Sequence, residues 1–216
     1  MFVETNAGVG VGVSDQQYID EGATILNSAK EVCDAVTMVI KEKEPFGSEY
    51  GLFREDHFLY TYLHLAADEK LTKSLMYTGL TAIAYETIVD KHGNLPCLRP
   101  MSMIAGRLSI QQGAKFIEKA YGGRGILLCG VPGVECGKIV IIGGGIAGTY
   151  AAKAAVGMDA EVTLLDIDMN RLLYLEDIFG ASITTLYSTE AHIINSLKLL
   201  IWLLVQYYCQ GQRHQS

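Results

Sequence analysis

Residues 138–148 read Lys-Ile-Val-Ile-Ile-Gly-Gly-Gly-Ile-Ala-Gly, and this stretch decides the fold of the chain. Four of its first five residues are β-branched, which predicts a fully buried strand. Glycines at 143, 145 and 148 follow with the spacing Gly-x-Gly-x-x-Gly, and an apolar segment over 150–156 predicts a helix. A second apolar run, 161–165, ends at Asp166. This order predicts a βαβ unit in a doubly wound parallel sheet.

Each glycine of the loop has its own predicted task in a dinucleotide site. Gly143 permits the tight turn, Gly145 lets the backbone approach a pyrophosphate at the helix N-terminus, and Gly148 lets the helix pack closely on the strand. The predicted cofactor-binding residues of the loop are therefore Gly143, Gly145, Ile146, Ala147 and Gly148. The alternative is a glycine-rich turn of a doubly wound sheet that binds no ligand.

Asp166 ends the second strand about 20 residues after the loop, where a carboxylate accepts hydrogen bonds from ribose hydroxyls. The same charge repels a 2′-phosphate, so the motif favours NAD over NADP as cofactor.

Composition restricts the function classes. A length of 216 residues fits one large or two small domains, and a net charge of −7 without a Lys/Arg run argues against nucleic acid as a partner. The five cysteines form no CxxC pair, which indicates a reducing cytoplasm with neither a disulfide framework nor a metal site. We find no signal peptide, and the most apolar stretch, 193–205, is interrupted and too short to span a membrane. We therefore expect a cytoplasmic protein without a membrane partner.

Strand and helix patterns alternate along the whole chain, which predicts parallel sheets of the Rossmann type in two domains, both incomplete. Pro96 and Pro100 mark the boundary between them. The predicted ranges are 1–100 for a partial substrate or catalytic domain, 101–120 for a linking helix, 121–198 for the first half of a nucleotide-binding domain, and 199–216 for a tail.

Two polar residues follow predicted strands of the first domain, where open α/β sheets place their sites. Lys43 comes after the strand 35–40, and His64 after the strand 59–63. Spacing alone leaves other interpretations open: a solvated lysine beside Glu42 and Glu44, and a core histidine. Ser102, at the start of the linking helix, has the alternative role of a helix N-cap.

The sequence resembles L-alanine dehydrogenase. This family belongs to a superfamily that includes the nicotinamide-binding subunit of proton-translocating transhydrogenase. The resemblance covers residues 1 to about 198 and is carried by blocks in the family's order. The blocks are Lys43-Glu44-Pro45, 58–67, 83–87, Pro100-Met101-Ser102, 105–107, 122–125, 130–134, 165–168 and 174–180.

The resemblance implies reversible, NAD-dependent oxidative deamination of L-alanine to pyruvate and ammonia, by an enzyme that assembles as a hexamer. It places substrate binding on Lys43, acid/base catalysis on His64, and contact with the cofactor phosphates on Ser102. An ammonium at a strand end can hold a carboxylate or polarise a carbonyl, and an imidazole can act as a general acid or base near neutral pH.

Both ends of the chain depart from the family pattern. Family members have a further strand and helix before the strand that begins at Phe2, and these carry an arginine that binds the substrate carboxylate. After Lys198 the chain diverges, and the family's next segment can be spelled by permitted codons in the neighbouring reading frame. We therefore interpret 199–216 as an out-of-frame tail, which leaves out the family's catalytic aspartate.

These departures lead us to expect a truncated alanine dehydrogenase that is inactive by itself. A second hypothesis is a non-catalytic NAD-binding or subunit-association fragment. A third is a transhydrogenase-type nicotinamide-binding subunit, which would bind NAD without alanine chemistry.

Overall fold

The computed structural model describes residues 1–198 and 202–205, which belong to two compact units, Met1–Leu98 and Arg99 onward. Each unit has its own core of buried apolar side chains. The first core consists of Cys33, Val39, Phe53, Leu59, Leu63, Leu71 and Leu75. The second centres on Ile139, Ile141, Ala151, Ala152, Val162, Leu164 and Leu175. Burial of these faces supplies the main favourable term in folding each unit.

The first unit contains two parallel sheets. Strands β1 (Phe2–Glu4) and β2 (Thr24–Leu26) form one, and β3 (Met38–Ile40), β4 (Phe58–Thr61) and β5 (Thr81–Ala84) form the other in the order β3-β4-β5. The helices are α1 (Asp15–Asp20), α2 (Ala29–Ala35) and α3 (Glu69–Thr78). Side chains of Ser14, Ser28 and Asp68 cap their N-termini, as the sequence leads one to expect of these residue types.

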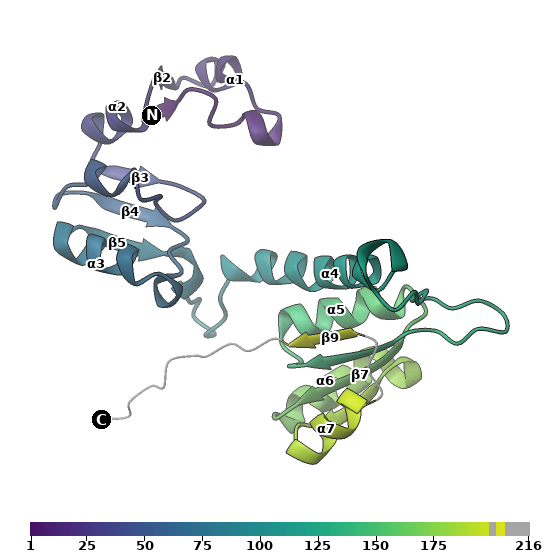
Figure 1. Cartoon of the computed structure of the whole chain (residues 1–216). Coiled ribbons are helices and arrows are strands. Elements are labelled where there is room, and N and C mark those ends of the chain that lie inside the picture. The colour runs from purple at the N-terminus through teal and green to yellow at the C-terminus, as the bar shows by residue number, and fades with distance from the viewer. Residues whose placement is uncertain (199–201, 206–216) are drawn as a thin grey trace, which may run out of the picture. The chain divides into compact units, whose positions relative to one another are not determined.

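The second unit is built on one sheet of parallel strands in the order β8-β7-β6-β9 (Figure 1). These are β6 (Lys138–Ile142), β7 (Glu161–Asp166), β8 (Thr184–Tyr187) and β9 (Trp202–Val205). The helices are α4 (Leu98–Phe116), α5 (Ile146–Val156), α6 (Met169–Phe179) and α7 (Glu190–Lys198). Single 3-10 turns lie at Val9–Val11, Tyr50–Leu52, Leu65–Ala67, Tyr85–Thr87, Lys119–Tyr121 and Gly180–Ser182.

Residues 138–148 form a strand, the glycine loop and the start of a helix, as the sequence predicts. β6 pairs with β7 on one side and β9 on the other, and its middle residues Ile139, Val140 and Ile141 are buried. A strand covered on both faces and both edges needs β-branched apolar residues, which is what this stretch supplies. The prediction of an α/β fold with parallel, Rossmann-type sheets is confirmed.

The predicted out-of-frame tail falls in part outside the described residues, which omit 199–201 and 206–216. Within it, Trp202–Val205 forms β9 and pairs in parallel with β6. The nucleotide unit therefore extends beyond the predicted limit at residue 198. The out-of-frame origin stays a prediction.

Candidate functional site

The glycine loop joins β6 to α5. Gly143 has φ of 103°, a conformation that favours glycine, and its N–H donates to the carbonyl of Leu165 at 2.7 Å. This bond ties the start of the loop to β7. Gly145 then stands at the N-cap of α5, whose first N–H groups point out of the helix end.

The other two glycines of the motif differ in the space that surrounds them. A Cβ on Gly148 would lie 1.9 Å from the carbonyl oxygen of Gly143, so the helix can approach the loop only if this residue is glycine. A Cβ on Gly145 would have no described protein atom within 4 Å. The space in front of Gly145 therefore lies at the electropositive end of an 11-residue helix, where an anion is stabilised.

Asp166 ends β7 beside this loop. One carboxylate oxygen accepts the N–H of Gly144, and the other accepts the N–H of Asp168 at 2.9 Å. A carboxylate offers about four lone-pair sites, so acceptor capacity remains for hydroxyl groups. The contact with Gly144 shows that Asp166 also holds the loop, a task that its position at a strand end did not reveal.

Arg171 and Thr149 hold the loop from α6 and α5, and sequence reasoning missed both. The Arg171 Nε donates to the carbonyl of Gly144, and its Nη2 donates to Thr149 Oγ1 at 2.7 Å. Thr149 Oγ1 in turn donates to the carbonyl of Gly145 at 2.8 Å. An arginine 27 residues after its partner carries no local pattern that would have indicated this contact.

Ser102 lies inside α4, four residues after the helix begins at Leu98, so the N-cap interpretation is wrong. Gly106 follows one turn later on the same face of the helix. A Cβ on Gly106 would lie 2.2 Å from the carbonyl oxygen of Ala147, so α4 packs directly against the first turn of α5. This contact brings the face of α4 that carries Ser102 to the glycine loop.

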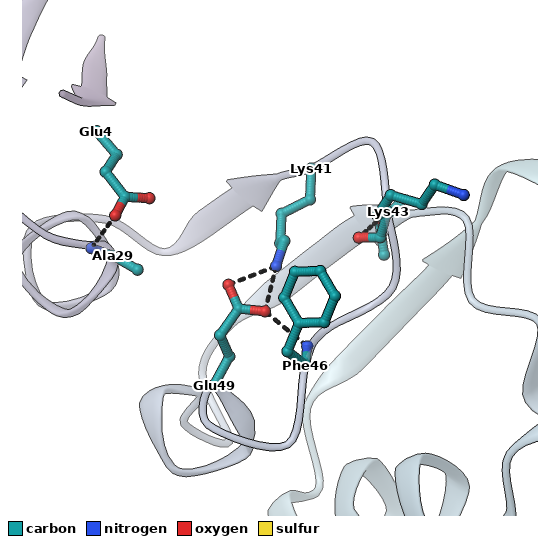
Figure 2. A network of polar contacts seen from close by, with 7 residues as sticks. Glu4, Ala29, Lys41, Lys43, Phe46 and Glu49 are labelled. Atoms are coloured by element: carbon teal, nitrogen blue, oxygen red, sulfur yellow. Dashed lines mark hydrogen bonds and ion pairs between the residues drawn. The ribbon is translucent and has the colours of Figure 1, made fainter. Parts of the chain in front are cut away.

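Lys43 follows β3 in the first unit. Its carbonyl accepts the hydroxyl hydrogen of Thr61 at 2.8 Å, which fixes the backbone beside the end of β4. The side chain is exposed, and Figure 2 shows it extending away from the ion pair between Lys41 and Glu49. Lys41 thus pairs with Glu49, whereas the Lys43 ammonium is directed away from this carboxylate.

His64 follows β4 with φ of 48° and ψ of 35°, a left-handed conformation that is uncommon outside glycine. Glu86, two residues after β5, accepts the N–H of His64 at 2.7 Å and that of Leu63 at 3.1 Å. The exposed imidazole stacks on the Tyr62 ring at 6.2 Å between centroids. Glu86 is a further residue that sequence reasoning left without a role, and here it holds the backbone that presents the imidazole.

Tyr62 is itself fixed, because its hydroxyl donates to the carbonyl of Cys97 at 2.7 Å. Partial burial, together with nearby Cys97, Glu42 and Glu86, raises the pKa of the Tyr62 phenol. The phenol therefore stays protonated near neutral pH and keeps donating this hydrogen bond.

Parallel pairing brings these residues to one edge of the sheet. Ile40 is opposite Tyr60 and Tyr60 is opposite Ile83, so Lys43, His64 and Glu86 all follow the C-terminal ends of adjacent strands. The first unit thus presents an ammonium group and an imidazole at that edge, and the second unit presents the N-terminus of α5 beside open space. No helix among the described residues is both long and apolar enough to cross a bilayer.

Two family models match the chain: the N-terminal domain of alanine dehydrogenase/PNT over residues 1–105 and the C-terminal domain over 109–201. Alanine dehydrogenase of Methanococcus maripaludis is 53% identical over 198 residues, which cover 92% of this chain and 53% of that protein. The Bacillus subtilis alanine dehydrogenase is 51% identical over 197 residues, covering 91% of this chain and 52% of that protein. The chain thus spans about half the length of these relatives.

Solved structures agree in fold. An L-alanine dehydrogenase structure, 52% identical, superposes with a TM-score of 0.83 over 94% of this chain and 56% of that one. A transhydrogenase from Sinorhizobium meliloti, 18% identical, has a TM-score of 0.73 over 95% of this chain and 59% of that one. The second likeness concerns the fold alone.

Proposed function

Because this chain belongs to the alanine dehydrogenase/PNT family, we propose that it forms part of an NAD-dependent L-alanine dehydrogenase. The reaction is the reversible oxidative deamination of L-alanine to pyruvate and ammonia. One observation carries the proposal: Gly145 leaves open space at the N-terminus of α5, beside a carboxylate at the end of the next strand. The pyrophosphate of a dinucleotide would occupy the open space, and its ribose hydroxyls would contact the carboxylate.

The nucleotide site comprises the glycine loop, Asp166 and Ser102. N–H groups of the first turn of α5, at Ile146, Ala147 and Gly148, face the pyrophosphate position, and the Ser102 hydroxyl adds a donor from α4. Asp166 accepts the ribose hydroxyls, and its charge disfavours NADP. When bound, the nicotinamide accepts the hydride of the alanine Cα–H.

The first unit supplies the chemistry of the substrate. The Lys43 ammonium binds the carboxylate or polarises the carbonyl of pyruvate. His64 takes a proton from the water that adds to the imine and returns one as the carbinolamine collapses and releases ammonia. The stacked Tyr62 ring and the backbone contact with Glu86 keep the imidazole in one place, which such proton transfer requires.

We propose further that this polypeptide binds NAD(H) but does not by itself turn over alanine. The chain spans about half the length of the alanine dehydrogenases that it matches. Purified chain is expected to give no alanine-dependent NAD reduction. Measurable turnover at ordinary enzyme concentration that is lost in His64→Ala would overturn this part of the proposal.

The test of the nucleotide site is a fluorescence titration with NADH. Gly145→Val fills the open space in front of α5 and should weaken NADH binding by at least about tenfold, a loss of roughly 1.4 kcal/mol. The protein should still fold cooperatively, because a Cβ at this position meets no described protein atom within 4 Å, although valine is a poorer N-cap residue than glycine. NADPH should bind more weakly than NADH to the unmodified chain.

Gly10→Val is the matched control, since a Cβ there also lies in open space. It should leave NADH binding as it is. Equal NADH affinity of Gly145→Val and the unmodified chain would contradict the assigned site.

A non-catalytic role in subunit association is the second candidate. The observation that favours it is the number of exposed apolar side chains, among them Phe2, Met38 and Ile40. We propose a hexamer, as the family resemblance implies. Light scattering after size exclusion tests this, and a monomeric mass at micromolar concentration would contradict it.

A further inference from the structure

The segment 127–137, which leads into β6, folds back on itself and carries two cysteines. Val131 and Val134 pair in the antiparallel sense, with N–H···O bonds of 3.2 and 2.8 Å. Cys129 stands two residues before Val131, and Cys136 stands two residues after Val134. In an antiparallel pair, residues at equal distances from a bonded pair lie opposite each other. The two cysteines therefore face each other across the base of this hairpin.

Contacts on either side of the cysteines show that the two arms of the hairpin lie close together. The N–H of Gly137 donates to the carbonyl of Leu128 at 2.8 Å. A Cβ on Gly137 would lie 3.3 Å from the Cα of Leu128, and a Cβ on Gly130 would lie 3.0 Å from the Cα of Cys136. The neighbours of Cys129 on both sides thus contact the arm that carries Cys136.

This separation suits a disulfide. Standard backbone dimensions, applied to the bond between Gly137 and Leu128, place the Cα atoms of Cys129 and Cys136 within about 7 Å of each other. Disulfides usually join Cα atoms that are about 4.4–6.8 Å apart. A glycine follows each cysteine, and Gly130 has a φ of 61°, so the backbone beside the pair is free of Cβ constraints.

The fold of the second unit fixes both arms. Leu128 is 3% exposed and belongs to the core of that unit. On the other arm, the carbonyl of Gly137 accepts the N–H of Glu161 at the start of β7, at 2.9 Å. The approach of the two cysteines therefore follows from the packing of the unit.

The cysteines of the described residues differ in access. Cys129 is exposed and Cys136 is half-buried, whereas Cys33 is buried. Burial, together with the nearby charge of Glu49, raises the pKa of the Cys33 thiol, which lowers the fraction of reactive thiolate. An oxidant in solution thus reaches Cys129 first.

We propose that Cys129 and Cys136 are a redox pair that closes to an intramolecular disulfide when the chain meets a disulfide oxidant of the glutathione class. The Cys129 thiolate attacks one sulfur of the oxidant, which forms a mixed disulfide and releases one thiol. The Cys136 thiolate then attacks the Cys129 sulfur and releases the second thiol. Two cysteine thiols are oxidised, the oxidant is reduced to two thiols, and the two cysteine protons pass to them. The new bond locks the base of the hairpin ahead of β6.

The experiment treats the full chain with glutathione disulfide, blocks the remaining thiols with iodoacetamide, and maps the peptides by mass spectrometry. Cleavage after Arg124 and Lys138 releases a peptide, 125–138, that contains both cysteines. We expect this peptide to lack two hydrogen atoms and to carry no alkyl group. Further cleavage after Glu135 should leave two pieces that separate only on reduction, because Glu135 lies between the cysteines.

Cys136→Ser removes the second nucleophile of the exchange. In this variant Cys129 should keep the attached glutathione, since no neighbouring thiol displaces it. Cys97→Ser is the matched control, because it makes the same substitution at another half-buried cysteine. It should form the disulfide as the unmodified chain does.

The locked hairpin should also be measurable as stability. A bond between residues 129 and 136 restricts the unfolded chain, so the oxidised protein should melt at least about 3 °C above the reduced protein. Cys136→Ser treated with the same oxidant should show no such rise.

Three results would overturn the redox pair: no reaction, a glutathione adduct that persists on Cys129 of the unmodified chain, or a bond from either cysteine to Cys97 or Cys209. Cys209 lies outside the described residues. A melting temperature that does not rise on oxidation would overturn the locking. If Cys136→Ser does not fold, the peptide map of the unmodified chain still decides. None of these readouts depends on NADH or alanine.

Discussion

At the scale of single residues, the three glycines of one motif have three different physical requirements. Gly143 has a positive φ, Gly148 lies so close to the carbonyl oxygen of Gly143 that a Cβ would clash with it, and Gly145 has neither constraint among the described residues. Gly10 also lies in open space, but Gly145 stands in addition at the N-cap of the 11-residue helix α5. Open space together with a helix N-terminus is what supports a ligand at Gly145.

Gly148→Ala should destabilise the second unit. Alanine ordinarily stabilises a helix by about 1 kcal/mol relative to glycine, but here the Cβ overlaps the Gly143 oxygen at 1.9 Å. Overpacking of this kind costs about 1–3 kcal/mol, so the clash decides the sign. Urea unfolding measures the change, with Gly145→Ala as the control in open space. An unchanged or higher midpoint in Gly148→Ala would refute this packing.

At the scale of elements, the site depends on how α4 and α6 meet the loop between β6 and α5. Gly106 lets α4 reach Ala147, and Arg171 reaches from α6 to Gly144. The β6–α5 unit is recognisable from local sequence, but the helices that fix its shape are not part of the motif. The loop is therefore held by residues on three helices, including Thr149 on α5 itself.

Arg171→Met should loosen the loop. It removes hydrogen bonds to Gly144 and Thr149, which together are worth about 1–3 kcal/mol. NADH affinity should fall in parallel, because the loop loses the anchor that fixes its carbonyls. Glu176→Gln on the exposed side of the same helix is the control. Calorimetric titration with NADH provides the measurement, and affinity equal to that of the control would show that Arg171 does not position the loop.

At the scale of the whole molecule, the division into two units separates the residues proposed for substrate chemistry from those proposed for nucleotide binding. Lys43 and His64 lie with the first core, and the glycine loop with the second. Separate apolar cores give each unit its own source of stability. Nucleotide binding and substrate chemistry should therefore respond to different mutations.

Scanning calorimetry should show two unfolding transitions. Leu59→Ala and Leu164→Ala each truncate a fully buried side chain, one in each unit, and should each cost about 2–5 kcal/mol. Each variant should lower a different transition, and NADH should raise only the one that Leu164→Ala lowers. A single transition lowered by both variants would contradict the separation.

The sequence by itself determined the fold class, the βαβ unit, the family and the positions where site residues follow strands. These rest on local periodicity and on motifs within about 30 residues, which an unfolded chain already contains. Only the tertiary structure decided which glycine of the motif faces open space, that Glu86 holds the backbone of His64, and that Arg171 holds the loop. Each of these depends on contacts between segments that meet only after packing, and no local pattern encodes such contacts.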